Sequence, residues 1–317
     1  MKLVGLMCVR SEDWILGASL RAALGWCDEV VIVDHNSADG TFDIINEVSR
    51  DNPWRIHYSL WRPMEEKELT SQHEGSRTLL HAHPGKSWTA QVPSDDESKW
   101  DEMTMREHSL LLGRKHGGTH FAMIDADEIL TANLIDRVRE DVRTLKPGEV
   151  LDYPLYAMRT LDEYQDDDTE WSRGVMSTVF MDAPGISWRP AMDGYHFHAR
   201  VPKGCGKRVT PVAWKDGGVM HLQFANRRRL VAKHCWYRMT ETIRYPGRNT
   251  AEQLNTKYDN ALKVPKHLSV APLEWWGNYP RDLIALSGWP WHEGEIYKMI
   301  QKYGKDAFSG LDLKGLA

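Results

Sequence analysis

The chain has 317 residues, a formal net charge of −5 and 41% hydrophobic residues. This composition excludes a disordered or collagen-like protein and allows two domains or one enlarged α/β domain. The sequence has no apolar run that approaches the roughly 18 residues of a membrane span. Its four cysteines, Cys8, Cys27, Cys205 and Cys235, form no C-x-x-C pair, which favours reduced thiols in a cytoplasmic protein over a disulfide framework or a zinc site.

The first 60 residues are predicted to alternate between strands and helices. Near-continuous apolar runs at residues 3–9, 30–33 and 56–60 are typical of buried strands. The segments between these runs carry helix-capping residues and apolar side chains at helical spacing. This alternation indicates a parallel, doubly wound sheet.

The pattern changes after residue 60. Residues 62–100 are polar and lack periodicity, so we expect a long insertion loop there. A helix is expected over roughly 101–115, with Met105, Leu111 and Leu112 facing inward. A buried strand should follow at 120–124, and an amphipathic helix at 134–145.

The second half is predicted to end in helices. Strands are expected near 149–158 and 175–182, and helices at 226–245, 251–262 and 293–303. We therefore expect an α/β domain over residues 1–222, with the insertion loop at 62–100, and a helical, aromatic-rich region over residues 223–317.

Charge is unevenly distributed along the chain. Residues 203–248 carry eleven Lys and Arg residues against two acidic residues, a net charge of +9, so the remaining residues carry −14. A basic segment in an acidic protein indicates a local anionic ligand, such as a phosphate group. The fourteen tryptophans suit a surface that stacks on sugar rings or bases.

Three polar clusters follow predicted strands: Arg10-Ser11-Glu12, Asp34-His35-Asn36 through Asp39, and Asp125-Ala126-Asp127. Ligands of open α/β sheets bind beyond the carboxyl ends of the strands, so we expect these clusters to converge. Asp125 and Asp127 alternate along an extended segment and can face one ligand. Because two close carboxylates repel each other, a cation between them is expected. Oxygen ligands suit Mg²⁺ or Mn²⁺ bound to substrate phosphates.

The same segments resemble family-2-type glycosyltransferases of the GT-A fold. The similar stretches are Val9-Arg10-Ser11-Glu12, then Val31-Ile32-Val33-Asp34-His35-Asn36-Ser37-Ala38-Asp39-Gly40-Thr41, then Phe121-Ala122-Met123-Ile124-Asp125-Ala126-Asp127-Glu128. The resemblance covers about the first 135 residues apart from the 62–100 insertion. It implies an α/β, Rossmann-like GT-A fold with a mixed or parallel sheet flanked by helices, a helical aromatic-rich C-terminal extension, and a nucleotide-sugar donor.

The resemblance also implies roles for individual residues. Glu12, Asp34 and Asp39 would hold the nucleoside, and their neighbours Arg10 and Asn36 are included in the donor site. Asp125 would lie near the ribose and the metal, and Asp127 would bind the metal directly. Arg106 would lie near the donor phosphates as a catalytic residue. Ser11 and His35 depart from the family, which more often has Asn and a second Asp there.

A third metal ligand is expected at His221, which directly precedes the basic helix. In related glycosyltransferases a His followed by a helix with Lys and Tyr closes over the donor diphosphate, which implies donor contacts from Lys233 and Tyr237. Positive charge there would neutralise the leaving diphosphate. An inverting enzyme also needs a base for the acceptor hydroxyl, and Asp193 and His198 are the catalytic candidates.

These features predict a metal-dependent glycosyltransferase that uses Mn²⁺ or Mg²⁺ and transfers a sugar from a nucleotide-sugar donor, expected to be a UDP-sugar, to a glycan, lipopolysaccharide or other lipid-linked acceptor. An alternative acceptor is a 5-hydroxymethylated pyrimidine in DNA, with the enzyme acting in the cytoplasm of a phage host. The +9 segment, the aromatic second half and the segment 239–248, which resembles phage-encoded glycosyltransferases, favour that alternative.

Two further hypotheses remain. A sugar nucleotidyltransferase would carry a Gly-rich phosphate loop where this chain has Arg10-Ser11-Glu12. A non-catalytic sugar-binding or nucleic-acid-binding protein would not need the intact pair of Asp125 and Asp127.

Overall fold

The computed structural model describes residues 1–61, 80–81, 102–167, 169, 172, 174–188 and 200–316. These residues form two compact units. The first unit comprises Met1–Leu155, Val175–Met220 and Pro272–Ile284, and the second comprises Tyr156–Gly174, His221–Ala271 and Ala285–Ala317. The expected division of the chain at residue 222 stays a prediction. None of the described helices is both long and apolar enough to span a bilayer.

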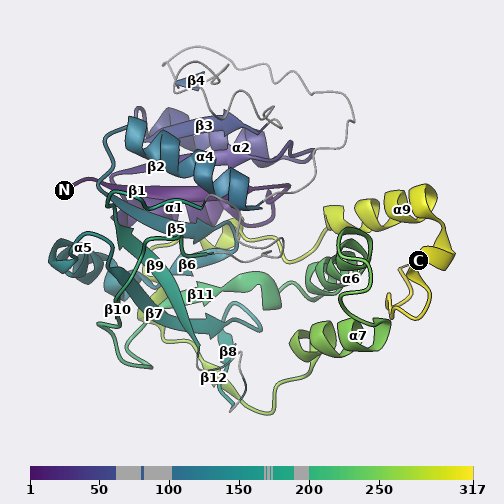
Figure 1. Ribbon diagram of the computed structural model, residues 1–317. Coiled ribbons are helices and arrows are strands. Elements are labelled where there is room, and N and C mark those ends of the chain that lie inside the picture. The colour runs from purple at the N-terminus through teal and green to yellow at the C-terminus, as the bar shows by residue number, and fades with distance from the viewer. Residues whose placement is uncertain are drawn as a thin grey trace. The chain divides into compact units, whose positions relative to one another are not determined.

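A mixed sheet with the strand order β4-β3-β2-β1-β5-β9-β7-β11-β6 organises the first unit (Figure 1). Its parallel strands are β1 (Leu3–Val9), β2 (Glu29–Asp34), β3 (Ile56–Leu60) and β5 (His120–Asp125). Beyond β5 lie β9 (Val175–Met181), which is antiparallel to β5, then β7 (Val150–Ala157), β11 (Val219–His221) and β6 (Glu128–Leu130). Two short strands complete it: β4 (Leu80–His81), antiparallel to β3, and β10 (Arg208–Val209), parallel to β7.

Side chains alternate across the strands and build an apolar core on each face of the sheet. Along β1, Leu3, Met7 and Val9 belong to one core cluster, whereas Val4 and Leu6 belong to another. A period of two with apolar residues on both sides is typical of a strand covered on both faces.

Helices cover both faces. The first cluster includes buried residues of α1 (Leu16–Trp26), α2 (Thr41–Asp51) and α5 (Ile135–Thr144), and the second includes residues of α4 (Glu102–Lys115). The predicted α/β class, with a mixed and parallel sheet flanked by helices, is therefore confirmed.

The inward face of α4 differs from the prediction in one residue. Leu110 is buried, whereas Leu111, expected to face inward, is 50% exposed. Successive residues turn by about 100° around a helix, so three consecutive leucines cannot all face the sheet.

The second unit contains most of the helical C-terminal region. Its helices are α6 (Arg227–Arg244), α7 (Ala251–Asp259) and α9 (Trp291–Tyr303), and β8 (Glu163–Gln165) pairs antiparallel with β12 (Leu268–Val270). The helix α8 (Leu273–Trp276) belongs to the first unit. Short 3-10 turns occur at Ala132–Leu134, Leu222–Phe224, Asn260–Leu262, Arg281–Leu283 and Lys305–Phe308.

Caps and aromatic contacts explain the packing of this unit. Asn226 caps α6 by accepting a hydrogen bond from the backbone of Arg229, and Thr250 begins α7 with a capping box. The ring of Trp236 on α6 lies 5.1 Å from that of Trp291 on α9. Tyr237 lies 5.6 Å from Tyr258 on α7. The predicted helical, aromatic-rich extension is thus confirmed.

Candidate functional site

The three polar clusters meet at one edge of the sheet. In the parallel register of β1 with its neighbours, Val9 pairs with Asp34 and Cys8 pairs with Asp125. The carboxyl ends of β1, β2 and β5 therefore lie side by side. This is the edge at which open α/β sheets bind ligands.

The carboxylate of Asp34 shapes the loop that follows β2. One oxygen accepts hydrogen bonds from the backbone N–H and the hydroxyl of Ser37, at 3.0 and 2.6 Å. The other accepts from the hydroxyl of Tyr58 at 3.0 Å. Burial raises the pKa of Asp34 above its usual value, although the bonds from Ser37 and Tyr58 oppose that shift. Asp34 thus fixes the loop expected to contact the nucleoside.

The loops after β1 and β2 are joined by side-chain hydrogen bonds. Ser11 and Asn36 both have positive φ angles, 52° and 54°, a conformation that costs energy for residues other than glycine. The backbone N–H of Ser11 donates to the hydroxyl of Ser37 at 2.7 Å. The backbone N–H of Glu12 donates to the hydroxyl of Thr41 at 2.8 Å.

Two predicted donor-site carboxylates also hold these loops. The carboxylate of Glu12 accepts from the indole N–H of Trp14 at 2.8 Å. Asp39 accepts from the backbone of Thr41 at 3.0 Å, at the start of α2, and from the backbone of Asp13 at 3.2 Å. Arg10 is half-buried directly after β1.

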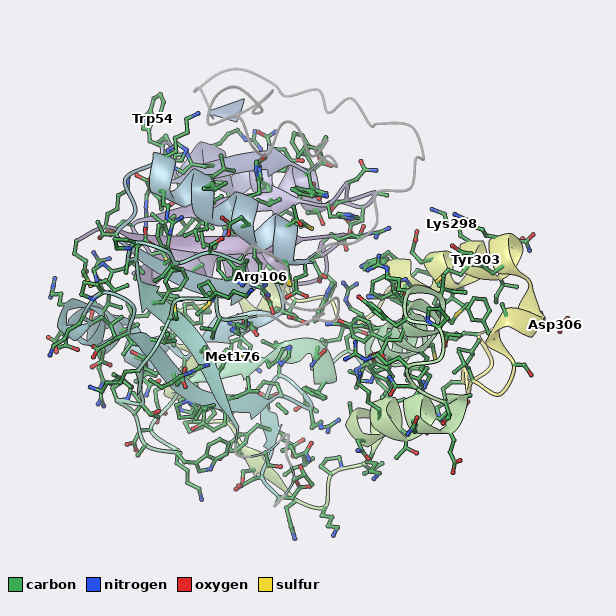
Figure 2. The ribbon with its side chains drawn as sticks, viewed as in Figure 1. Trp54, Arg106, Met176, Lys298, Tyr303 and Asp306 are labelled. Carbon is green, nitrogen blue, oxygen red and sulfur yellow. The ribbon has the colours of Figure 1, made fainter. Side chains whose placement is uncertain are left out.

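Asp125, the last residue of β5, is held between two arginines. Arg106 on α4, labelled in Figure 2, donates to one carboxylate oxygen at 2.8 Å, and Arg200 donates to the other at 3.2 Å. Burial, and to a lesser extent the neighbouring Asp127, act to raise the pKa of Asp125, but the guanidinium groups of Arg106 and Arg200 outweigh them and hold that pKa well below its usual value. Asp125 is therefore ionised at neutral pH.

Acidic partners fix both arginines. Glu102, one turn before Arg106 on α4, accepts from that guanidinium at 2.8 Å. Glu128 accepts two bonds from Arg200, at 2.8 and 2.6 Å, and also accepts the backbone N–H of Asp125 at 3.0 Å. The bidentate pair of Arg200 with Glu128 is directional as well as strong.

The resulting cluster is acidic. It combines four carboxylates with two guanidinium groups, which gives a formal charge of −2; its members are Glu102, Arg106, Asp125, Asp127, Glu128 and Arg200. Asp127 is buried, with 8% of its surface exposed. Excess negative charge in a buried setting attracts a divalent cation, and an all-oxygen donor set suits Mg²⁺ or Mn²⁺.

Five further predicted residues lie outside the described part of the first unit. Asp193 and His198 fall outside the described residues. His221, Lys233 and Tyr237 belong to the second unit. There the ammonium of Lys233 lies 6.0 Å from the ring centre of Tyr237 and donates to Gln223 at 3.2 Å. Metal binding by His221 and donor binding by Lys233 and Tyr237 stay predictions.

Sequence reasoning missed the roles of Arg200 and Glu128. Glu128 was visible beside the Asp125–Asp127 pair, but nothing in the sequence indicated that it would orient an arginine. Arg200 lies 72 residues from Glu128 along the chain, and no periodic pattern predicts so distant a pairing.

Comparisons with known proteins give structural likenesses only. Neither a family model nor a curated protein matches the chain. A crystal structure of S. aureus TarS, residues 1–349, is 10% identical over 97% of this chain and 89% of that chain, with a TM-score of 0.41. The same fragment in complex with UDP-GlcNAc is 9% identical over 98% and 84% of the two chains, with a TM-score of 0.39. In complex with UDP, the match is 13% identical over 50% and 36%, with a TM-score of 0.31.

Proposed function

We propose that this chain is a metal-dependent glycosyltransferase that transfers a sugar from a nucleotide-sugar donor, a UDP-sugar in the first instance, to an acceptor hydroxyl. The observation that carries the proposal is the convergence of Asp125–Asp127 with the loops after β1 and β2 at one sheet edge. It agrees with the GT-A resemblance of those same three segments.

The acidic cluster fits a hard divalent cation. Mg²⁺ and Mn²⁺ are commonly held by one or two protein carboxylates together with substrate phosphates. By the GT-A resemblance, Asp127 would make the principal protein contact to this ion, and Asp125, whose two oxygens accept from arginines, would lie near it. Such a cation, when bound, would stabilise the negative charge that develops on a leaving diphosphate.

The chain's own residues would position the donor. Arg106 and Arg200 fix the orientation of Asp125, which the resemblance places near the ribose. The linked loops of Ser11 and Ser37 offer a preformed surface for the nucleoside. Preorganised groups contribute because they need no rearrangement as the reaction proceeds.

For the acceptor, we favour a glycan or lipid-linked glycan over DNA. The positive charge of residues 203–248 is one of the three arguments for DNA, but several of these residues are ion-paired within the chain. The pairs are Lys207–Glu149, Arg208–Asp152, Arg228–Glu293 and Arg238–Asp259. Such pairing reduces the charge available for contacts to DNA phosphates.

A panel of UDP-, GDP- and TDP-sugars with Mn²⁺, Mg²⁺ or EDTA tests the proposal. We expect metal-dependent release of a nucleoside diphosphate. We also expect the mass of the acceptor to increase by that of one sugar residue. Asp127→Asn should lower the rate by about 100-fold or more, the range seen when one electrostatic stabiliser is removed. The exposed Asp51 on α2 gives a matched control, and Asp51→Asn should retain the wild-type rate.

Three results would decide against parts of the proposal. If none of the nucleotide sugars in the panel is consumed, the transferase assignment is overturned. Equal rates for Asp127→Asn and Asp51→Asn would overturn the metal contact. Mass increase of hydroxymethylated DNA rather than of glycans would reassign the acceptor, and pyrophosphate release from a nucleoside triphosphate with a sugar 1-phosphate would indicate a nucleotidyltransferase instead.

A further inference from the structure

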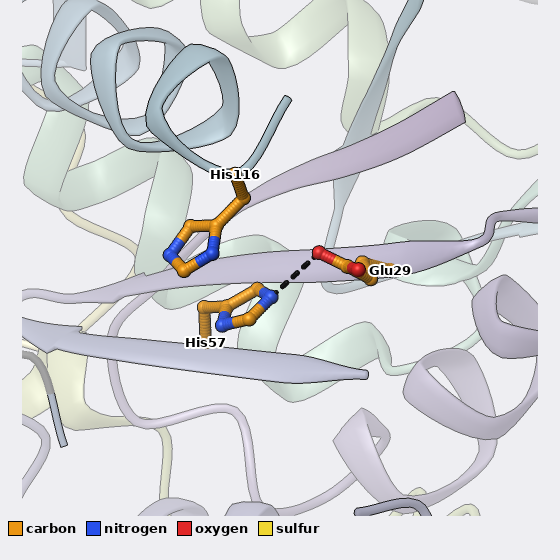
Figure 3. A group of neighbouring side chains, drawn as sticks. All are labelled: Glu29, His57 and His116. Carbon is orange, nitrogen blue, oxygen red and sulfur yellow. Dashed lines mark hydrogen bonds and ion pairs between the residues drawn. The ribbon is translucent and has the colours of Figure 1, made fainter. Parts of the chain in front are cut away.

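A second cluster of potential ligands lies at the opposite ends of the same strands. Glu29 begins β2, His57 is the second residue of β3, and His116 follows α4 shortly before β5. Figure 3 shows their side chains grouped together, and one ligand atom from each lies within 4.8 Å of the others. Asp34 ends the strand that Glu29 begins, so the two ends are about 16 Å apart at the usual rise of about 3.3 Å per residue.

The three side chains are close enough to share one ion. Nε2 of His57 lies 2.7 Å from one carboxylate oxygen of Glu29. The rings of His57 and His116 are stacked, with centres 3.5 Å apart and planes 18° apart. The terminal torsion of a histidine is broad. A modest turn of either ring can therefore direct a nitrogen of each toward a common ion at the usual distance of about 2.1 Å.

Lys2 contacts two members of this cluster, Glu29 and His116. Its ammonium lies 2.5 Å from the carboxylate oxygen of Glu29 that faces away from the bond to His57, and it donates to the backbone carbonyl of His116 at 2.6 Å. Partners of this kind orient the residues that bind a metal directly. His57 is buried, whereas Glu29 and His116 are half-buried, so the cluster is enclosed yet reachable from solvent.

We propose that Glu29, His57 and His116 bind a divalent transition-metal ion of the zinc class. Two imidazoles and one carboxylate form a known zinc ligand set that leaves a fourth position for water. Imidazole selects Zn²⁺, Co²⁺, Ni²⁺ or Cu²⁺, whereas carboxylates select Mg²⁺, Ca²⁺ or Mn²⁺. The two ends of the sheet therefore differ in the metals that they prefer.

The bound ion would stabilise the amino end of the sheet. It would join β2, β3 and the segment between α4 and β5, three parts of the chain that are distant in sequence. A ligand that binds only the folded state raises the free energy of unfolding by an amount that grows with the logarithm of its concentration over its dissociation constant. This proposal is independent of the proposed transferase activity.

The test uses the full chain without an affinity tag, freed of metal and titrated with Zn²⁺. We expect calorimetry to show one zinc equivalent bound at this cluster and the melting temperature to rise. His116→Gln and Glu29→Gln should each weaken that binding by at least about tenfold. His267, an exposed histidine of the second unit, gives the control, and His267→Gln should bind as wild type.

Co²⁺ provides a second measurement that does not depend on a variant. Imidazole-bound Co²⁺ in the wild-type chain should absorb visible light, and excess Zn²⁺ should abolish the band. Asp127→Asn should leave the band unchanged, since that residue lies at the other end of the sheet. Absence of the band in wild type, or equal zinc affinity in wild type, His116→Gln and Glu29→Gln, would overturn the proposal.

Discussion

Arg106 donates a 2.8 Å hydrogen bond to the carboxylate of Asp125 from within a buried setting. The arginine comes from α4 and the aspartate from the end of β5, so the pair joins a helix to the edge of the candidate site. Glu102 holds the same guanidinium from the preceding turn. Removing the arginine would leave two carboxylates without their main partner.

We therefore predict that Arg106→Met destabilises the chain by about 3 kcal/mol, the lower end of the cost of breaking a buried ion pair from one side, because Glu102 is buried whereas Asp125 is partly exposed. Urea denaturation at neutral pH measures this change. Arg21 on α1 forms a more exposed ion pair with Glu47 on α2, at 2.6 Å. Arg21→Met should cost about 1 kcal/mol or less, and an equal loss in both variants would contradict the prediction.

Asp34 allows a prediction about pH. Because its folded-state pKa is raised above the usual 3.8, its contribution to stability is present at low pH and declines as the pH rises through the folded-state pKa. Asp34→Asn keeps an acceptor for Ser37 and cannot ionise. The stability of Asp34→Asn relative to wild type should therefore increase between pH 4 and pH 7, measured by urea denaturation. A constant difference across that range would refute the assignment.

His234 on α6 should make stability depend on pH in the opposite direction. Burial lowers its pKa from 6.5 to about 4, helped by Lys233, Arg238 and Arg227, while its bond to the carbonyl of Tyr258 opposes the shift. The unfolded chain therefore binds the proton more readily, so stability falls as the pH drops from 6.5 toward 4. The loss should reach up to about 3 kcal/mol.

Denaturation of His234→Gln and His267→Gln at several pH values between 4 and 7 tests this expectation. The first variant should lose most of the pH dependence attributed to this histidine. The second replaces an exposed histidine and should follow wild type. If both curves match wild type, another group is responsible.

Gly218 is predicted to be intolerant of a side chain. A Cβ there would lie 2.1 Å from the backbone oxygen of Pro154 in β7, which cannot move without disturbing the sheet. Gly218→Ala should cost about 3 kcal/mol, at the upper end of overpacking effects. Gly206 has open space around the same position, and thermal melting should show Gly206→Ala close to wild type.

Local patterns were sufficient to predict the parallel strands and the helices that cover them. Val30–Val33 is apolar throughout, and a strand buried on both faces requires such a run. The same logic predicted that Asp34 and Asp125 would meet at one edge, since parallel neighbours end together. The predicted inward face of α4 was wrong at Leu111, because consecutive leucines do not define a unique apolar face of a helix.

Long-range pairings were beyond sequence patterns. The antiparallel position of β9 between β5 and β7 is set by contacts between segments far apart in the sequence. The same is true of the pairing of Arg200 with Glu128, which are 72 residues apart. The cluster of Glu29, His57 and His116 was missed for the same reason, since its members come from three separate elements.

The joined loops of β1 and β2 have a consequence for motion. Because Ser37 bonds the backbone of Ser11 and Thr41 bonds that of Glu12, neither loop can open without breaking bonds to the other. Their amides should therefore exchange with solvent as one cooperative group. A ligand that contacts either loop would slow exchange in both, so this edge of the sheet would respond to occupancy as a single rigid body.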